Sequence, residues 1–148
     1  MPAMLSPDTP CPCGQAISAR NPAACRYADC CGRWHAGPQH LQAPDAEALM
    51  RSRYSAYVLG LADYLQATWH PDTRPATLNL NEPGLRWLGL AVKRHARLDD
   101  THALVEFVAR SKLGGKAHRL HETSRFEHGT AAGEPARWLY VDGELHAG

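Results

Sequence analysis

HALVEFVARSKLGGKAHRLHETSRFEH, residues 102–128, is the stretch that decides the fold. It holds two runs of strand-like composition, 102–112 and 116–128, on either side of Gly114 and Gly115. Two consecutive glycines accommodate a tight turn, and strands joined by so short a link run antiparallel. The stretch therefore predicts a β-hairpin.

The second run of this hairpin predicts where one acidic side chain points. Residues two apart in a strand face the same side of the sheet. One parity of this run carries Leu120, Glu122, Ser124 and Phe126. We therefore expect Glu122 to point into the core, in the direction of its apolar neighbours.

Two further strand-like runs flank the hairpin, at 85–98 and 136–142. Asp99-Asp100 separates the first run from the hairpin, and residues 129–134 separate the last. Such short links predict an antiparallel meander of about four strands. Within the first run, one face is expected to carry Leu88, Leu90 and Val92.

Helical periodicity precedes the strands. After Pro44, with Asp45 or Ala43 as the cap, one helical face carries Ala46, Leu49, Met50, Tyr54, Tyr57, Val58 and Leu61. Gly60 predicts a break, followed by a short second helix that ends before Pro71. Two helices followed by a run of strands predict an α+β fold, with the helices packed on one face of a curved antiparallel sheet.

Charge and hydropathy exclude several classes of protein. The 148 residues include 16 basic and 15 acidic ones, a formal net charge of +1, so no strong field favours nucleic acid or an anionic membrane as a partner. No apolar run approaches the roughly 20 residues that cross a bilayer, and residues 1–10 lack the pattern of a secretion signal. We expect a cytoplasmic protein without a membrane partner.

All five cysteines lie between positions 11 and 31. Cytosolic thiols stay reduced unless they serve metal or redox chemistry, and five in so short a segment suit four metal ligands and one spare. Residues 11–37 also contain too few large apolar side chains to build a core. We predict a zinc knuckle at 11–37, after a flexible tail at 1–10 and before one α+β domain at 44–148.

Two cysteine pairs supply the predicted zinc ligands, namely Cys11, Cys13, Cys30 and Cys31. Zn²⁺ suits soft sulfur, and a set of four thiolates leaves no coordination position for an activated water. Cys25 and His35 are alternates for this set. The net negative charge must be offset by nearby groups, for which Arg20, Arg26 and Arg33 are available.

Cys11-Pro12-Cys13-Gly14, followed by Tyr27-Ala28-Asp29-Cys30-Cys31-Gly32, resembles the SEC-C zinc motif, although sixteen residues between the pairs is longer than usual for it. Further stretches over nearly the whole chain resemble the YchJ-like family of uncharacterised bacterial proteins. Among these stretches are Thr68-Trp69-His70-Pro71, Trp87-Leu88-Gly89-Leu90, Phe107-Val108-Ala109-Arg110 and Glu122-Thr123-Ser124-Arg125-Phe126.

This resemblance implies a SEC-C motif followed by a cystatin-like, cone-shaped domain similar to nuclear transport factor 2. By position, it also makes Cys11, Cys13, Cys30 and Cys31 the zinc ligands. Such cones often enclose a pocket between helices and sheet, which is the default place for a ligand.

Glu122 is the sharpest candidate for chemistry in that pocket. As a general acid or base it would act with Arg53 or His70, which are the other catalytic candidates. The favoured alternative is a buried ion pair between Arg53 and Glu122 that ties the first helix to the sheet.

Three function classes follow. The favoured hypothesis is a zinc-binding module that contacts another protein or a small ligand. The alternative is an enzyme that uses Glu122 for proton transfer, and the sequence leans against it because no complete catalytic constellation is present. Nucleic-acid binding through the knuckle is the least favoured, and the nine histidines are expected to be mostly scattered surface residues.

Overall fold

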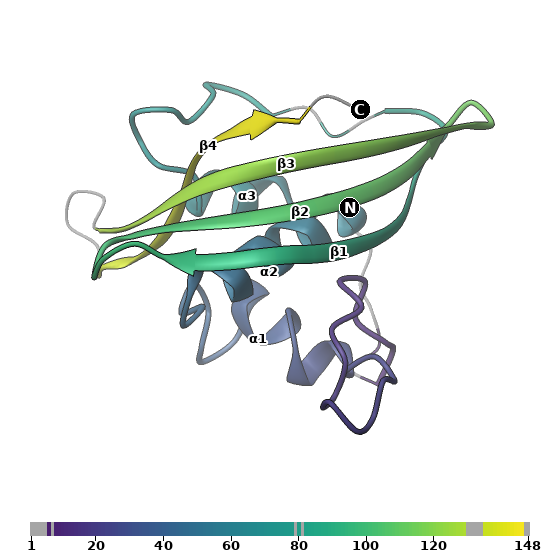
Figure 1. Cartoon of the computed structure of the whole chain (residues 1–148), viewed down its shortest axis with the longest axis horizontal. Coiled ribbons are helices and arrows are strands. Elements are labelled where there is room, and N and C mark those ends of the chain that lie inside the picture. Colours follow the sequence, from purple (N-terminus) through teal and green to yellow (C-terminus); the bar gives the residue numbers. More distant parts are fainter. Residues whose placement is uncertain (1–5, 7, 79, 81, 130–134, 147–148) are drawn as a thin grey trace.

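The computed structural model describes residues 6, 8–78, 80, 82–129 and 135–146. Its four strands form one antiparallel sheet in the order β1-β2-β3-β4 (Figure 1). Their bounds are Leu85–Arg97 for β1, His102–Leu113 for β2, Lys116–Gly129 for β3 and Arg137–Leu145 for β4. The predicted meander is therefore confirmed, and each strand begins and ends close to its predicted bounds.

The helices lie against one face of this sheet (Figure 1). The two predicted helices are α2, Ala46–Leu59, and α3, Ala62–Ala67. Asp45 caps α2 by accepting a hydrogen bond from the backbone N–H of Ala48, and Gly60 ends it with a φ of 74°. The α+β class is confirmed.

Two short elements within the cysteine segment were not predicted: a 3₁₀ turn at Tyr27–Asp29 and a one-turn helix, α1, at Gly32–His35. Both are too short to show helical periodicity, so no pattern in the sequence predicts them.

The hydrophobic core fills the space between α2 and the inner face of the sheet. Leu49, Met50 and Tyr54 of α2 are buried against inward residues of the central strands. The buried inward residues of β2 and β3 include Val105, Phe107, Ala109 and Phe126. Each fully buried side chain of this size contributes about 1.5–3 kcal/mol, so this contact holds the two layers together. Val58 is 37% exposed, so the apolar face of α2 is narrower than predicted.

Glu122 does share the inner face with Phe126, because β3 keeps a regular alternation there. The prediction for β1 was wrong at one residue. A bulge between Trp87 and Gly89 places Leu88 as an extra residue, so Trp87 and Leu90 face the core while Leu88 is 55% exposed. An inserted residue shifts the alternation by one position, which composition alone does not reveal.

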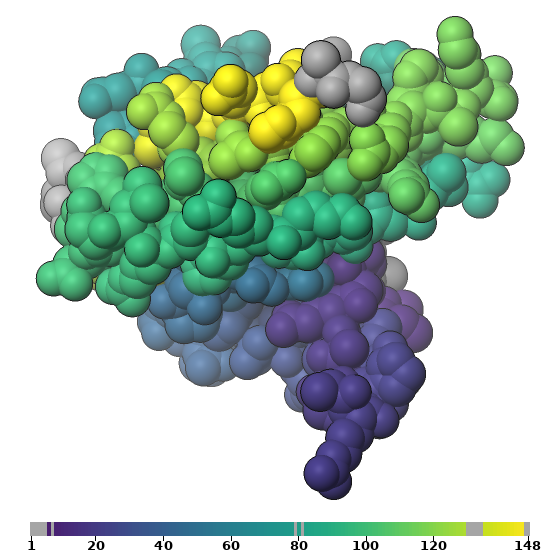
Figure 2. Space-filling view, in the orientation of Figure 1, coloured from purple at the N-terminus to yellow at the C-terminus, as the bar shows by residue number. Residues whose placement is uncertain are grey.

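The cysteine segment forms a lobe that projects from the body below the sheet (Figure 2). Residues 15–25 fold back on themselves as a short hairpin, which we call the finger. Its backbone hydrogen bonds include Ile17 N–H to the carbonyl of Ala23 and Cys25 N–H to the carbonyl of Gln15. Residues 14–23 are all exposed.

Part of the predicted tail pairs with this lobe. Pro10 bridges to Arg26, the N–H of Tyr27 donates to the carbonyl of Thr9, and Asp8 forms an ion pair with Arg26. Residues 1–5 and 7 of that tail lie outside the described residues.

Among the described residues, none of the helices has the length and apolar character needed to cross a membrane.

The bulge in β1 makes a direct prediction about two leucines. Leu90→Ala is expected to lower the free energy of unfolding by about 1–2 kcal/mol, because Leu90 packs against the core. Leu88→Ala is expected to lower it by less than about 0.5 kcal/mol, because Leu88 faces solvent. Denaturant unfolding of both variants checks this. An equal loss of unfolding free energy in both would mean that Leu88 and Leu90 face the same side, with no bulge between them.

Candidate functional site

Two tight backbone features bring the cysteine pairs together. The carbonyl of Cys11 accepts from the N–H of Gly14, which closes a turn around Cys13. Cys30 and Cys31 lie between the 3₁₀ turn and α1. Gly32 follows them because a Cβ there would lie 2.6 Å from the carbonyl oxygen of Tyr27, too close for any other residue.

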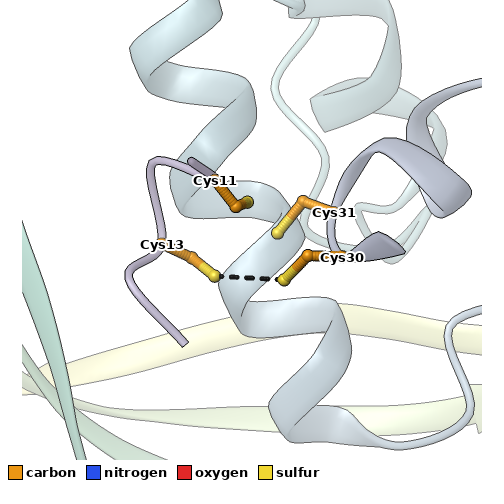
Figure 3. Close-up of side chains that lie close together, drawn as sticks. All are labelled: Cys11, Cys13, Cys30 and Cys31. Carbon is orange, nitrogen blue, oxygen red and sulfur yellow. Dashed lines mark hydrogen bonds between the residues drawn. The ribbon is translucent and has the colours of Figure 1, made fainter. Parts of the chain in front are cut away.

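The four thiols converge on one point (Figure 3). The sulfur atoms of Cys11, Cys13, Cys30 and Cys31 all lie within 4.8 Å of one another, and all four residues are buried. Cys13 Sγ and Cys30 Sγ are 3.5 Å apart. A tetrahedral Zn²⁺ with Zn–S bonds of about 2.3 Å separates its sulfur ligands by roughly 3.8 Å, so the arrangement fits such an ion.

The thiols also shift one another's pKa values. Hydrogen bonds from Cys13, Cys30 and Cys31 hold the pKa of the Cys11 thiol well below its usual range. Contacts with Cys11 and Cys13 raise the pKa of Cys30 and of Cys31, because a further thiolate would form beside an existing one. Four thiolates this close together would repel one another, and a positive ion among them would offset that repulsion.

Helix α2 forms one wall of the thiol cluster. Ser55 is fully buried, and its Oγ lies 3.6 Å from Cys11 Sγ. Arg51 donates from Nη1 to the carbonyl of Cys13 and from Nε to Glu47. These contacts place a hydroxyl and a guanidinium where negative sulfur charge needs to be offset.

Of the arginines expected to offset that charge, Arg33 does contact the cluster, donating to the carbonyl of Cys30. Arg26 is instead ion-paired with Asp8 and Asp29, and Arg20 is an exposed residue of the finger. Arg51 and Ser55 were not predicted for this role. The signal that could have found them is the i, i+4, i+8 series Glu47, Arg51, Ser55, which places three polar side chains along one side of α2.

The two alternate ligands lie outside the cluster of four. Cys25 Sγ contacts the carbonyl of Ala16 within the finger. His35 uses both ring nitrogens elsewhere: Nε2 lies 2.8 Å from the carbonyl of Ser52, and Nδ1 lies close to the Tyr27 hydroxyl. Because a carbonyl only accepts, Nε2 carries the proton and Nδ1 accepts from Tyr27. Burial lowers the pKa of His35, in agreement with this neutral tautomer.

His35 thereby fastens α1 to the body. The hydroxyl of Ser52 donates to the carbonyl of Leu49, so its oxygen accepts from the hydroxyl of Tyr64 in α3. The ring of Tyr64 packs edge-on against His35 at 4.7 Å between centroids. This buried polar network joins the cysteine lobe to α2 and α3 independently of sulfur.

A second feature is a cavity of about 160 Å³ between α2 and the sheet. Aromatic and apolar side chains form most of its wall. It is lined by Met50, Arg53, Tyr54, Tyr57, Trp87, Phe107, Ala109, Leu120, Glu122, Ser124, Phe126 and Tyr140. Two of the three catalytic candidates, Arg53 and Glu122, therefore meet at one cavity.

The side chain of Glu122 is hydrogen-bonded to a residue of its own strand, β3. The hydroxyl of Ser124 donates to Glu122 Oε2 and is the single hydrogen-bond donor to this carboxylate among the described residues. The backbone of Gly143 in β4 lies so close to the carboxylate that a Cβ there would overlap it.

Arg53 does not form an ion pair with Glu122 within the part of the chain that is described. Its Nη1 donates to the carbonyl of Leu65 and to the hydroxyl of Thr68. The guanidinium also lies 4.9 Å from the ring centre of Trp69 and 4.6 Å from that of Tyr140. Desolvation lowers the pKa of Arg53. Arg53 thus ties α2 to α3 and β4, and its hydrogen bonds and cation–π contacts go to these elements and not to Glu122.

His70 does not line this cavity. The backbone N–H of His70 donates to the carbonyl of Tyr140. Its ring Nδ1 accepts from the backbone N–H of Asp72, and its ring Nε2 lies 3.8 Å from Glu127 Oε1. The structure therefore separates His70 from the other two candidates.

Comparison with known proteins identifies relatives along the whole chain. Residues 45–143 match the family model described as YchJ, middle NTF2-like domain. A UPF0225 protein of Bordetella pertussis is 56% identical over 142 residues, which cover 95% of this chain and 97% of the relative. A UPF0225 protein of Ralstonia nicotianae is 54% identical over 146 residues, covering 95% of this chain and 94% of the relative.

Two solved structures are similar to the whole chain. One is the crystal structure of a SEC-C motif containing protein from Psychrobacter arcticus, with a TM-score of 0.76 and 31% identity, covering 98% of this chain and 87% of the other. The other is the solution structure of a SEC-C motif containing protein from Rhodopseudomonas palustris, with a TM-score of 0.72 and 31% identity, covering 94% of this chain and 100% of the other.

The role assigned to His35 yields a test. His35→Phe keeps an aromatic ring against Tyr64 but leaves the Tyr27 hydroxyl without its acceptor. We expect the free energy of unfolding to fall by about 1–3 kcal/mol, and the bound metal per chain to stay unchanged. Chemical denaturation and metal analysis check the two parts. Loss of the metal in a folded variant would make His35 a ligand.

Proposed function

The chain belongs to the YchJ-like family and has UPF0225 proteins as relatives, and from that premise we propose that it is a zinc-stabilised binding protein whose cavity takes a small organic ligand. One observation carries the proposal: the Glu122 carboxylate stands at the wall of a cavity with largely aromatic sides, hydrogen-bonded by Ser124 but not ion-paired with Arg53. A concave apolar site with few convergent polar groups is the usual form of a small-molecule site.

The zinc part of the proposal rests on the donor set. Cys11, Cys13, Cys30 and Cys31 would hold the ion, and such an ion supplies folding energy to a segment that has little core of its own. With four sulfurs around it, no position is left for substrate or water. The family's SEC-C motif supports the same assignment.

The ligand part rests on the chemistry of the cavity wall. A carboxylate beside Tyr54, Tyr57 and Trp87 suits a molecule with a protonated amine and an aromatic or aliphatic body. The amine would donate to Glu122 while the body contacts the rings. The alternative is an enzyme that uses Glu122 of the same cavity as a general acid or base. Chemical conversion of the bound molecule would distinguish this enzyme from a binding protein.

A second candidate is contact with another protein through the finger. Its residues 15–23 are exposed, Ile17 is 54% exposed, and the cysteine cluster anchors both ends of the loop. Nucleic acid is less favoured as a partner, because Arg53 is buried and Arg26 and Arg51 are already ion-paired.

A cytoplasmic location is part of the proposal. Four thiols held as zinc ligands need a compartment that keeps them from forming disulfides, and all five cysteines of this chain are free.

The four proposed zinc ligands predict which cysteine variants retain zinc. Protein purified under reducing conditions should contain one Zn²⁺ per chain, and Cys30→Ser should lose it. Cys25→Ser is the matched control and should keep it, because Cys25 lies in the finger rather than in the cluster. Metal analysis with a thiol count checks both variants, and full zinc content in Cys30→Ser contradicts the set.

The cavity predicts selective binding of amines. In an NMR titration, benzylamine should shift the signals of Tyr54, Tyr57 and Trp87, whereas toluene should bind more weakly. Glu122→Gln should weaken benzylamine binding by about 10-fold or more, because a charged hydrogen bond is lost. Glu127→Gln, on the same strand but outside the cavity, should not. Equal affinity in wild type and Glu122→Gln would refute this use of the cavity.

A further inference from the structure

Three potential metal ligands meet on the outer face of the sheet, the face opposite α2. They are Glu106 of β2, His121 of β3 and His146, which directly follows β4. The sequence predicts scattered histidines without ligand spacing, and these two are 25 positions apart. Strand register brings them together.

The register can be followed from residue to residue. Val108 lies opposite His121 and Glu106 opposite Thr123, so Glu106 and His121 are diagonal neighbours on one face. His146 continues the pairing of Glu122 with Leu145, and its N–H donates to the carbonyl of His121. His121 alternates with the inward Glu122 and therefore points outward.

The side chains are already in contact. His121 Nε2 lies 2.7 Å from Glu106 Oε2, and the rings of His121 and His146 stack with centroids 4.2 Å apart. His146 Nε2 lies 2.7 Å from the hydroxyl of Thr123. One potential ligand atom from each of the three residues falls within 4.8 Å of the other two.

We propose that Glu106, His121 and His146 form a second metal site, for a divalent transition ion such as Ni²⁺ or Co²⁺. Two imidazoles and one carboxylate are ligands that these ions accept, whereas Mg²⁺ and Ca²⁺ prefer oxygen alone. Three protein ligands leave coordination positions open, in contrast to the closed set of four thiols.

Binding requires a small local change. The ion takes the place of the proton between His121 Nε2 and Glu106 Oε2, and these atoms must separate to roughly 3.4 Å for metal bonds of about 2.1 Å. Charges of both signs lie nearby: Arg94 of β1 lies opposite Glu106, and Glu144 of β4 lies opposite Thr123. Glu144 thus offers a negative charge that counters the arginine.

The test uses tag-free, zinc-loaded full-length protein titrated with Ni²⁺ in a calorimeter, with zinc content measured before and after. We expect one Ni²⁺ per chain to bind while the zinc stays in place. His146→Gln and Glu106→Gln should each weaken Ni²⁺ binding by about 10- to 100-fold. His118→Gln removes an exposed histidine of the same strand outside the cluster and should have no effect.

Because His146 lies after the last strand, its substitution should leave the fold intact, and far-ultraviolet circular dichroism verifies this. Absence of Ni²⁺ binding beyond the zinc site would overturn the proposal. So would equal Ni²⁺ affinity in wild type and in folded His146→Gln.

Discussion

Four sulfur atoms buried against one helix are the constraint on which the N-terminal third of this protein depends. Thiols that crowd within 4.8 Å of one another cannot all ionise alone. The divalent ion that we propose, with Ser55 and Arg51 of α2 alongside, would offset this charge repulsion. The cysteine lobe and the α+β domain consequently share one core, in which Cys11, Cys13, Cys30 and Cys31 cluster with Leu49 and Tyr54.

Helix α2 connects this cluster to the cavity. Arg51 and Ser55 face the thiols, while Met50, Arg53, Tyr54 and Tyr57 line the cavity. Whatever fixes the position of α2 therefore also fixes one wall of the cavity. In this account the ion acts on the cavity only through the helix, as a support, and the chemistry of the cavity belongs to Glu122 and its aromatic neighbours.

Much of this architecture could be predicted because it depends on local patterns. Alternation placed Glu122 on the inner face, and Asp45 and Gly60 marked the ends of α2. The features that could not be predicted from the sequence depend on how distant segments pair in three dimensions. The bulge at Leu88, the partners of His35 and the meeting of His121 with His146 each follow from register or from docking of the lobe. None of these leaves a periodic signal in the sequence.

Hydrogen exchange measured with and without metal tests the central claim most directly. If the ion fastens the cysteine lobe to α2, chelation under reducing conditions should remove amide protection from residues 11–35 and reduce it in α2. The strands β2 and β3 should keep their protection. Unchanged protection of residues 11–35 after complete metal removal would contradict the account.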